Sequence, residues 1–276
     1  MQHAVRGLGL ARALGRAALV AALATVVFAG CGAEDQGDNV DPDQVDAVDA
    51  PTLGACRVLT PEDVKLPSNA TKTVDCSESH TAETFAVGQM PASLDDSEYD
   101  DREVGTFAYD TCTKRFMAFL GADESLVMRT VVSWAWFRPS EKAWEDGARW
   151  YRCDIVGGGD DTESYVDLPE TAKGLLLKLD DKWMVCGNGA TVASSTKIPC
   201  TEDHNWRAVT TIKLGEPGEK YPGDRLVEVK SRDFCSDSVG AWLNYPIDFD
   251  FGYTWFHEAE WQAGNRRSVC WAKTVE

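Results

Sequence analysis

The cysteines constrain the fold of this chain more than any other feature, because eight of the nine fall into two similarly spaced sets of four. The first set is Cys56, Cys76, Cys112 and Cys153, and the second set is Cys186, Cys200, Cys235 and Cys270. Within each set, the last three cysteines follow one another at intervals of 35 to 41 residues. A spacing that recurs along the chain predicts an internal duplication.

Two short motifs recur at matching places in the two halves. The run CSESHTAETFAV, which begins at Cys76, aligns with CTEDHNWRAVTT, which begins at Cys200, and both place a histidine four residues after the cysteine. The run WEDGARWYRC, which ends at Cys153, aligns without a gap with WQAGNRRSVC, which ends at Cys270. We therefore predict two tandem modules. Their expected boundaries are residues 52–157 for module one, 158–179 for a linker and 180–276 for module two.

Residues 1–30 have the pattern of a secretory signal, with three arginines, no acid and an apolar run at 17–29. The run has 13 residues, well short of the ~20 that a transmembrane helix needs. Ala29 and Gly30 directly before Cys31 resemble the lipobox of bacterial lipoproteins, in which the cysteine is lipidated. We therefore predict a signal peptide over 1–30 and a lipid anchor on Cys31 that holds the protein on the outer face of the cytoplasmic membrane.

The segment at 31–51 is rich in acids and has no basic residue, so we predict an extended, disordered tether. Without the signal peptide, the chain has 24 Lys and Arg against 45 Asp and Glu, a formal charge of −21. Such a surface repels nucleic acid and anionic lipid headgroups. We expect no nucleic-acid partner, and we expect the lipid anchor to be the only contact with the membrane.

An even number of cysteines in an exported chain predicts disulfide bonds, because nothing outside the membrane keeps thiols reduced. If both modules close on themselves in the same way, three pairing schemes remain. The scheme that we favour is Cys56–Cys76, Cys112–Cys153, Cys186–Cys200 and Cys235–Cys270. In this scheme the first disulfide closes a loop of 20 residues in module one and of 14 in module two. That difference suits a hairpin whose two strands are joined by the disulfide and whose connecting turn varies in length. A zinc site is disfavoured, because no Cys-x-x-Cys pair occurs.

Each module contains one stretch with the apolar periodicity of an amphipathic helix. In module one the apolar residues are Val104, Phe107, Ala108, Cys112, Phe116, Phe119 and Leu120, and in module two they are Leu226, Cys235, Val239, Trp242 and Leu243. Asp224 stands where it would cap the start of the second helix. Strand-prone runs lie at 84–87, 128–137, 151–156, 208–214, 252–257 and 268–275. The predicted fold class is α+β, with a small antiparallel sheet and one helix in each module.

His80 and Glu83 form a His-x-x-Glu spacing, which on a helix would put both side chains on one face and serve a metal. Module two has His204 but carries Arg207 in place of the glutamate, so a metal role would concern one module only. The interpretation that we favour is structural, with His80 beside a disulfide and bonded to the backbone of the turn that follows. The two histidines are also candidate recognition residues. We expect no metal and no cofactor.

A second constellation precedes the last strand of each module. Its members are Trp144, Gly147 and Arg149, with their counterparts Trp261, Gly264 and Arg266. We expect the glycine to adopt a left-handed backbone angle, the tryptophan to pack across the turn, and the arginine to stack on the tryptophan or pair with an acid. The alternative is a binding pocket for a peptide or glycan.

Nucleophilic catalysis finds little support in the sequence. Gly-x-Ser-x-Gly, Ser-x-x-Lys and His-Glu-x-x-His do not occur in the exported chain. Paired cysteines leave no thiol for a nucleophile. We therefore expect no enzyme activity, although the many acids leave a carboxylate pair open.

The order of these motifs resembles the septum-formation family of secreted and membrane-attached proteins from high-GC Gram-positive bacteria. The residues that carry the resemblance are Gly54, Cys56, Cys76, His80, Glu83, Cys112, Trp144, Gly147, Arg149 and Cys153. The same order returns between Cys186 and Cys270, so the resemblance covers nearly all of the exported chain as two copies. It implies an association with cell division.

Together these features predict a non-enzymatic binding module at the cell envelope, whose partner is an envelope protein or a cell-wall component. One alternative is a cell-wall hydrolase that acts through acidic residues. Another is a metal-binding lipoprotein that uses His80 and Glu83. Because the surface is strongly acidic, a basic or neutral partner is favoured over an acidic one.

Overall fold

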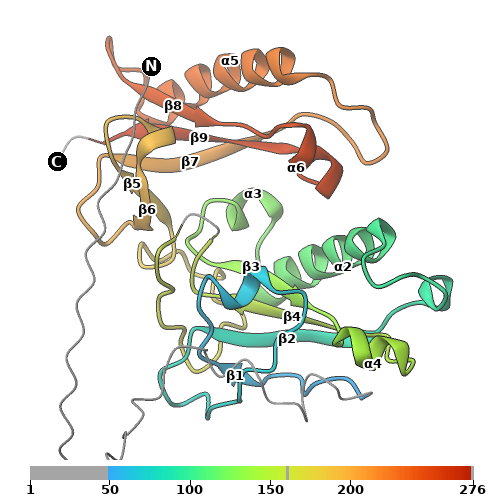
Figure 1. Ribbon diagram of the computed structural model, residues 1–276. Helices are drawn as coiled ribbons and strands as arrows, with labels where there is room; N and C mark the ends of the chain where they lie inside the picture. The colour runs from blue at the N-terminus through green and yellow to red at the C-terminus, as the bar shows by residue number, and fades with distance from the viewer. Residues whose placement is uncertain (1–48, 160–161, 275–276) are drawn as a thin grey trace, which may run out of the picture. The chain divides into compact units, whose positions relative to one another are not determined.

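The computed structural model describes residues 49–159 and 162–274 of the chain (Figure 1). These residues form an α+β structure with two antiparallel sheets, which we call sheet 1 and sheet 2. The predicted signal peptide, the lipidated Cys31 and nearly all of the predicted tether lie outside the described residues. No helix among the described residues is long and apolar enough to cross a membrane.

Sheet 1 has four strands in the order β1-β2-β4-β3. They are β1 Cys56–Arg57, β2 Ala82–Gln89, β3 Ser133–Phe137 and β4 Trp150–Val156. Every residue of β4 is buried, including the alternating polar residues Arg152 and Asp154, so both faces of this strand are covered although it lies in an antiparallel sheet. A register shift between Thr84 and Ala86 interrupts the pairing of β2 with β4.

Sheet 2 has five strands in the order β6-β5-β7-β9-β8. They are β5 Val185–Asn188, β6 Thr196–Pro199, β7 Trp206–Lys213, β8 Phe251–Thr254 and β9 Arg267–Lys273. A register shift between Ala208 and Thr210 interrupts the pairing of β7 with β9, as the shift in β2 does in sheet 1. The sequence did not predict β1, β5 and β6, because these short strands, CR, VCGN and TKIP, contain no run of β-branched or aromatic residues.

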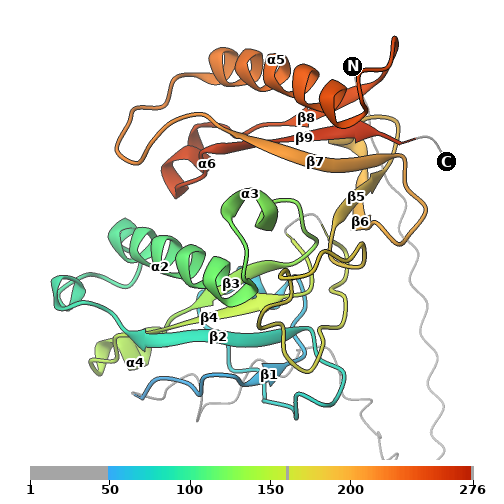
Figure 2. The same ribbon diagram turned by 180° about the vertical axis from the view of Figure 1, so that it is seen from behind.

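One long helix packs on a face of each sheet, as the two opposite views show (Figures 1 and 2). These helices are α2 Arg102–Leu120 and α5 Asp224–Trp242, of 19 residues each. The short helices are α3 Glu124–Val127, α4 Glu141–Glu145 and α6 Glu258–Ala263. Single 3-10 turns occupy η1 Asp63–Lys65, η2 Ala92–Leu94 and η3 Val192–Ser194.

The buried face of α5 differs from the expected one. Its buried residues are Val227, Ser231, Cys235, Val239 and Gly240. Leu226 is 43 % exposed and Trp242 is 50 % exposed, so their assignment to the apolar face is wrong. The reason is that α5 packs against sheet 2 through one side only, which carries Val227, Cys235 and Val239.

The expected cap of α5 is also wrong. The residue at the cap position is Gly223, with φ 93°, and Asp224 is the first helical residue. The carboxylate of Asp224 accepts a hydrogen bond from the Tyr221 hydroxyl, and it faces the His257 ring at 3.3 Å. Aspartate in the first turn still favours the helix through its dipole.

The structure contains the predicted disulfide bonds. Its four pairs are Cys56–Cys76, Cys112–Cys153, Cys186–Cys200 and Cys235–Cys270. The first and third clip a short strand to the loop or strand that follows it, and the second and fourth tie the long helix to the strand that it covers. Each bridge contributes about 2–4 kcal/mol to stability, chiefly by restricting the unfolded chain.

The largest group of buried apolar side chains includes residues of both sheets. Its members include Phe85, Cys112, Ile155, Trp206, Val269 and Trp271. Between the sheets, α3 packs against β7 (Figures 1 and 2). The Arg129 guanidinium after α3 donates to the Val209 carbonyl at 2.9 Å, and the Thr211 hydroxyl donates to Ser125 at 2.8 Å. The two sheets therefore share one core.

Candidate functional site

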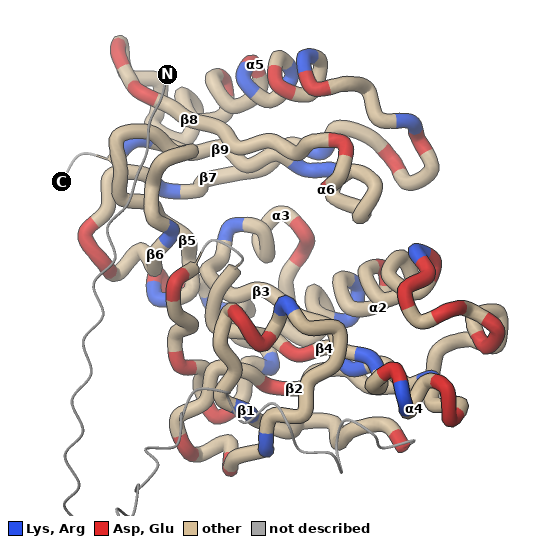
Figure 3. Tube along the Cα trace, in the orientation of Figure 1, with Lys and Arg blue, Asp and Glu red and all other residues tan. Residues whose placement is uncertain are grey.

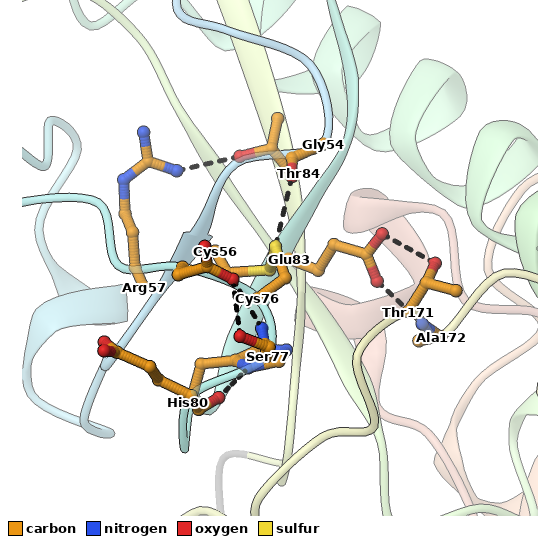
Figure 4. The surroundings of a disulfide bond; sticks show 12 residues. Gly54, Cys56, Arg57, Cys76, Ser77, His80, Glu83, Thr84, Thr171 and Ala172 are labelled. Atoms are coloured by element: carbon orange, nitrogen blue, oxygen red, sulfur yellow. Dashed lines mark hydrogen bonds between the residues drawn. A yellow bond between two sulfur atoms is a disulfide. The ribbon is translucent and has the colours of Figure 1, made fainter.

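The first candidate site lies where β1 meets the loop before β2 (Figure 4). Cys56 of β1 is bonded to Cys76 in that loop, and the Gly54 N–H donates to the Thr84 carbonyl at 2.8 Å. The bridge therefore fixes the path of the chain into β2, which carries Glu83, and it holds the loop that carries His80.

His80 is 1 % exposed and lies just before β2. Its Nδ1 lies 2.8 Å from the carbonyl oxygen of Glu78, and its buried Nε2 has no hydrogen-bond partner in the described chain. The histidine thus bonds the turn that precedes it, so the expectation of a bond to the turn that follows is wrong. The reason is that the chain turns at 76–79 and is already extended from Ala82 onward.

Glu83 lies in β2 rather than on a helix, so the helical geometry behind the metal alternative does not occur. Its carboxylate accepts hydrogen bonds from the Thr171 hydroxyl at 2.9 Å and from the Ala172 N–H at 2.7 Å. In Figure 4 the carboxylate points toward these two residues and away from His80. Glu83 therefore fastens the segment between the sheets to β2. No group of three or more His, Cys, Asp or Glu in the described ranges is arranged to hold a metal ion.

The corresponding residues near β7 repeat part of this arrangement. The Nδ1 of His204 lies 2.7 Å from the Glu202 carbonyl oxygen, two residues back, as in the first case. Arg207 donates to both carboxylate oxygens of Asp181. This hydrogen bonding holds the pKa of Asp181 below its ordinary value of 3.8. Arg207 of β7 thus binds the segment between the two sheets, as Glu83 of β2 does, with the charge of the strand residue reversed.

The second candidate site is the pair formed by Trp144 of α4 and Arg149, which lies after this helix. The guanidinium carbon of Arg149 lies 4.0 Å from the ring centroid of Trp144, and Arg149 donates to the carbonyls of Trp144, Ala148 and Asp95. The Trp144 indole N–H donates to the Ser97 carbonyl at 3.2 Å. The ring is buried, so this geometry joins the turn after α4 to the loop before α2.

Trp261 of α6 and Arg266, which lies after this helix, form the same arrangement. The guanidinium carbon lies 3.8 Å from the ring centroid, and Arg266 donates to the carbonyls of Trp261 and Asn265. The indole N–H donates to the Glu219 carbonyl at 3.1 Å, in the loop before α5. Gly147 and Gly264 have φ of 94° and 114°, the left-handed angles that we expected. Both arginines stack on their tryptophans, which is the first of the two expected geometries.

Sequence reasoning missed a buried group of charges on sheet 1. Arg152 Nε lies 3.0 Å from Asp154 Oδ2, and the Thr84 hydroxyl donates to Asp154 at 2.7 Å. Arg57 donates to the Thr84 hydroxyl at 2.9 Å. Burial lowers the pKa of Arg57, and it lowers the pKa of Arg152 to about 10. The signal was in the sequence, because Arg152 and Asp154 are two apart in a strand and share a face.

The first surface hollow lies along β3, which is one of the two edge strands of sheet 1. It has a volume of about 270 Å³. Its lining includes Leu66, Pro67, Trp134, Trp136, Tyr165 and the polar residues Lys65 and Ser133. Aromatic side chains with a few polar groups at their margin are the composition of peptide and glycan sites. The sequence treats this tryptophan run only as a strand.

The second surface hollow lies beyond the C-terminal end of α5. It is lined by Leu243, Pro246, Asp248, Phe249, Asp250 and Lys273 and has a volume of about 470 Å³. Exposed apolar side chains adjoin it at Trp242, Tyr245 and Ile247. The sequence offered no signal for this surface, because the helical pattern assigns Trp242 to the buried face.

The carboxyl groups whose pKa values are shifted have lowered pKa values, whereas a general acid needs a raised one. Hydrogen bonds lower the pKa of each: from the Ser77 backbone to Asp75, from Arg207 to Asp181 and from the Tyr221 hydroxyl to Asp224. A catalytic acid at neutral pH requires a raised pKa. These three carboxylates are therefore suited to remain charged.

The sequence profile of the family described as septum formation matches residues 53–270. The chain belongs to the septum-formation family. The match begins three residues before Cys56 and ends at Cys270, so it includes all four disulfides, the whole of sheet 1 and all of sheet 2 except the end of β9. Membership fits a role in cell division. No curated protein and no solved structure matches the chain significantly.

Proposed function

We propose that this septum-formation protein is a lipid-anchored, extracytoplasmic binding protein that engages an envelope protein or a cell-wall component during division. The observation that carries the proposal is the family match over residues 53–270. Binding, rather than catalysis, is the mode of action. Two tandem copies of one module, 52–157 and 180–276, form the exported part.

Export is supported by the cysteines. Four disulfides are expected of a protein that folds outside the cytoplasm. The arginines, the apolar run and the Ala-Gly-Cys sequence at the N-terminus fit delivery by a signal peptide and anchoring through Cys31.

The tandem copies are supported by shared geometry in the two halves. Each half has a helix of 19 residues tied by a disulfide to the strand that it covers. Each also has a stacked Trp–Arg pair and a register shift in the corresponding strand. Unrelated halves would have no reason to share all three.

A binding role, rather than a catalytic one, is supported by the hydrogen bonds that the candidate residues make. The side chains of Glu83, Arg149 and Arg266 all make hydrogen bonds with backbone groups of the same chain. Surface that is open to a ligand includes two hollows, one beside β3 and one beyond α5. Neither hollow contains the lowered-pKa carboxyl groups Asp75, Asp181 or Asp224.

The anchor is tested with Cys31→Ser. Cells that express the unchanged chain are fed an alkyne fatty acid, and label on the protein is detected after fractionation. We expect labelled protein in the membrane fraction, with the variant unlabelled and released. Equal label on both chains would show that Cys31 is not the lipidated residue.

Binding and hydrolysis are separated by two measurements on the same full-length protein. Incubation with purified cell wall is expected to release no soluble fragments. Cross-linking in dividing cells is expected to yield a discrete adduct that Trp136→Ala in the β3 hollow reduces, while Lys114→Ala on the exposed side of α2 does not. Release of wall fragments that one Asp→Asn or Glu→Gln substitution abolishes would support the hydrolase instead.

A further inference from the structure

The C-terminal end of α5 carries a group of exposed apolar side chains, which we call the α5 tip and define as residues 242–250. Trp242 is 50 % exposed, Tyr245 is 73 % exposed and Ile247 is fully exposed. Three large apolar side chains within six residues form a patch rather than scattered exposure. Such a patch marks an interaction surface.

The backbone of the α5 tip holds these side chains outward. The Tyr245 N–H donates to the Gly240 carbonyl at 2.7 Å, and the Asn244 N–H donates to the Ala241 carbonyl at 3.0 Å, which is the Schellman pattern. Asn244 and Tyr245 have φ of 63° and 52°. A left-handed angle is costly for a bulky residue such as tyrosine, and strain of this kind clusters at functional sites.

The hollow beside the tip combines an apolar floor with an acidic rim. Leu243, Pro246 and Phe249 supply the apolar lining. Lys273 is paired with Asp250 at 2.9 Å, whereas Asp248 has no ion-pair partner in the described ranges. Figure 3 shows acidic positions on the loop that leads from α5 into β8. The surface therefore suits an apolar ligand that also carries positive charge.

The end of α2 provides a template for what covers such a site. Phe119 and Leu120 stand seven and eight residues after Cys112, and their carbonyls accept hydrogen bonds from Gly174 at 2.7 Å and from Leu176 at 3.0 Å. The Leu176 side chain is buried in the shared core. The segment at 172–179 of the same chain thus satisfies the last two backbone carbonyls of α2 with hydrogen bonds.

The end of α5 presents backbone carbonyls at the equivalent positions, but no described segment like 172–179 binds them. Trp242 and Leu243 stand seven and eight residues after Cys235, and no donor in the described part of the chain bonds to their carbonyls. The residue that follows is left-handed in both helices, Gly121 after α2 and Asn244 after α5. The α5 tip is therefore the equivalent of a covered site, left open to solvent.

We propose that the α5 tip binds a basic, leucine-rich segment of a partner protein, as the end of α2 binds residues 172–179. That internal segment reads AKGLLLKL, with Lys173 and Lys178 on either side of three leucines. A leucine of the partner enters the hollow, its backbone N–H groups bond the open carbonyls, and its cation faces Asp248. This inference rests on the proposed binding function and names one surface and one chemistry for it.

The test uses the purified full-length chain and a fluorescently labelled peptide with the sequence AKGLLLKL, followed by fluorescence polarisation. We expect saturable binding that Trp242→Ser and Ile247→Ser each weaken by about tenfold, as for apolar anchors of an interface. Asp248→Asn weakens binding at low salt and leaves it little changed at high salt. The charge-reversed peptide AEGLLLEL binds more weakly than AKGLLLKL by about tenfold or more.

The matched control is Leu53→Ser, which removes a leucine that is 60 % exposed outside the tip. It is expected to leave the dissociation constant unchanged. Because all the substituted side chains are exposed, the variants are expected to keep the circular dichroism spectrum and melting temperature of the parent. That check separates loss of the site from loss of the fold.

Three results would overturn the proposal. The first is peptide binding that neither Trp242→Ser nor Ile247→Ser weakens. The second is binding to phosphatidylcholine vesicles, dependent on Ile247, with no binding of the peptide, which would assign the tip to a membrane. The third is self-association in sedimentation that Ile247→Ser abolishes, which would assign the tip to a second copy.

Failure of this inference is distinguishable from failure of the proposed function. The result of the peptide test does not depend on where the protein is located in the cell, so the test can succeed while Cys31→Ser leaves localisation unchanged. Conversely, cross-linking in dividing cells that depends on Trp136 and not on Trp242 would keep the binding function and overturn the assignment to the α5 tip.

Discussion

Arg149 and Arg266 each cover the face of a buried tryptophan and bond the backbone around it. The same residue types at the same spacing produce the same geometry twice, because a left-handed glycine lets the chain turn back so that the arginine reaches the ring. The stacking was among the predicted geometries. The sequence did not predict which carbonyl accepts each indole N–H, because Ser97 and Glu219 lie more than forty residues away from their tryptophans in sequence.

Arg149→Ala is expected to destabilise the chain by about 1–3 kcal/mol, because it removes the stacking and charge-assisted bonds to three carbonyls. The matched control is Arg115→Ala on the exposed side of α2, which is expected to change stability by less than about 0.5 kcal/mol. Urea unfolding curves measure both. Equal losses would contradict the structural role of Arg149.

The buried charges on sheet 1 are unbalanced, because Arg57 and Arg152 share the single carboxylate of Asp154. Asp154→Asn leaves two buried cations without an anion, and we expect a loss of about 3–5 kcal/mol. Arg152→Met leaves one cation with one anion and keeps the volume, so the loss is expected to be smaller by more than about 1 kcal/mol. Urea unfolding of both variants measures these losses of stability. A larger loss of stability in Arg152→Met than in Asp154→Asn would refute the charge argument.

At the scale of elements, the two long helices follow from sequence, but their surroundings do not. Helical periodicity predicts α2 and α5 and places both helix cysteines on the buried face, as found. It does not predict that Leu226 and Trp242 remain exposed, because periodicity marks an apolar stripe and not how much of the stripe a neighbour covers. The start of α5 is likewise set by a loop contact, since Tyr221 and His257 both reach Asp224.

Asp224 is expected to make the stability of the chain depend on acid pH. The Tyr221 hydroxyl holds the pKa of Asp224 below its ordinary value of 3.8 in the folded chain. Its stabilising contribution is therefore present above 3.8 and is lost as pH falls through the folded pKa, because the unfolded chain takes up the proton first. Thermal melts are expected to show a smaller fall between about pH 5 and about pH 2.5 in Asp224→Asn than in the parent.

The control for this measurement is Asp237→Asn, which changes another exposed carboxyl group of α5 that makes no ion pair in the described chain. It is expected to melt with the parent's pH dependence. A parallel fall in the parent and in Asp224→Asn would mean that the hydrogen bond from Tyr221 adds no stability.

At the scale of the whole molecule, the shared core makes the two sheets one folding unit. Buried side chains of both sheets belong to one group, and α3 links the sheets through β7 and through the Glu124–Arg267 ion pair. The segment at 172–179, predicted as part of a linker, contributes Leu176 to that core. The two sheets are therefore expected to depend on each other for stability.

We expect the oxidised full-length chain to unfold in a single transition. Differential scanning calorimetry is expected to give equal calorimetric and van't Hoff enthalpies, and near-UV and far-UV circular dichroism are expected to give coincident curves. Two separate transitions would show that the sheets fold independently and that their contacts add little stability.

The sequence by itself determined the features that depend on covalent spacing and local periodicity. They are the cysteine sets, the two helices, the longer strands, the left-handed glycines and the family resemblance. Tertiary structure alone decided which polar residues these elements bury and which apolar residues they leave exposed. It buried His80 and Glu83, paired Arg57 and Arg152 with Asp154, and left Trp242 in solvent. The physical reason is that burial depends on which distant segment covers a side chain, and no local pattern records that segment.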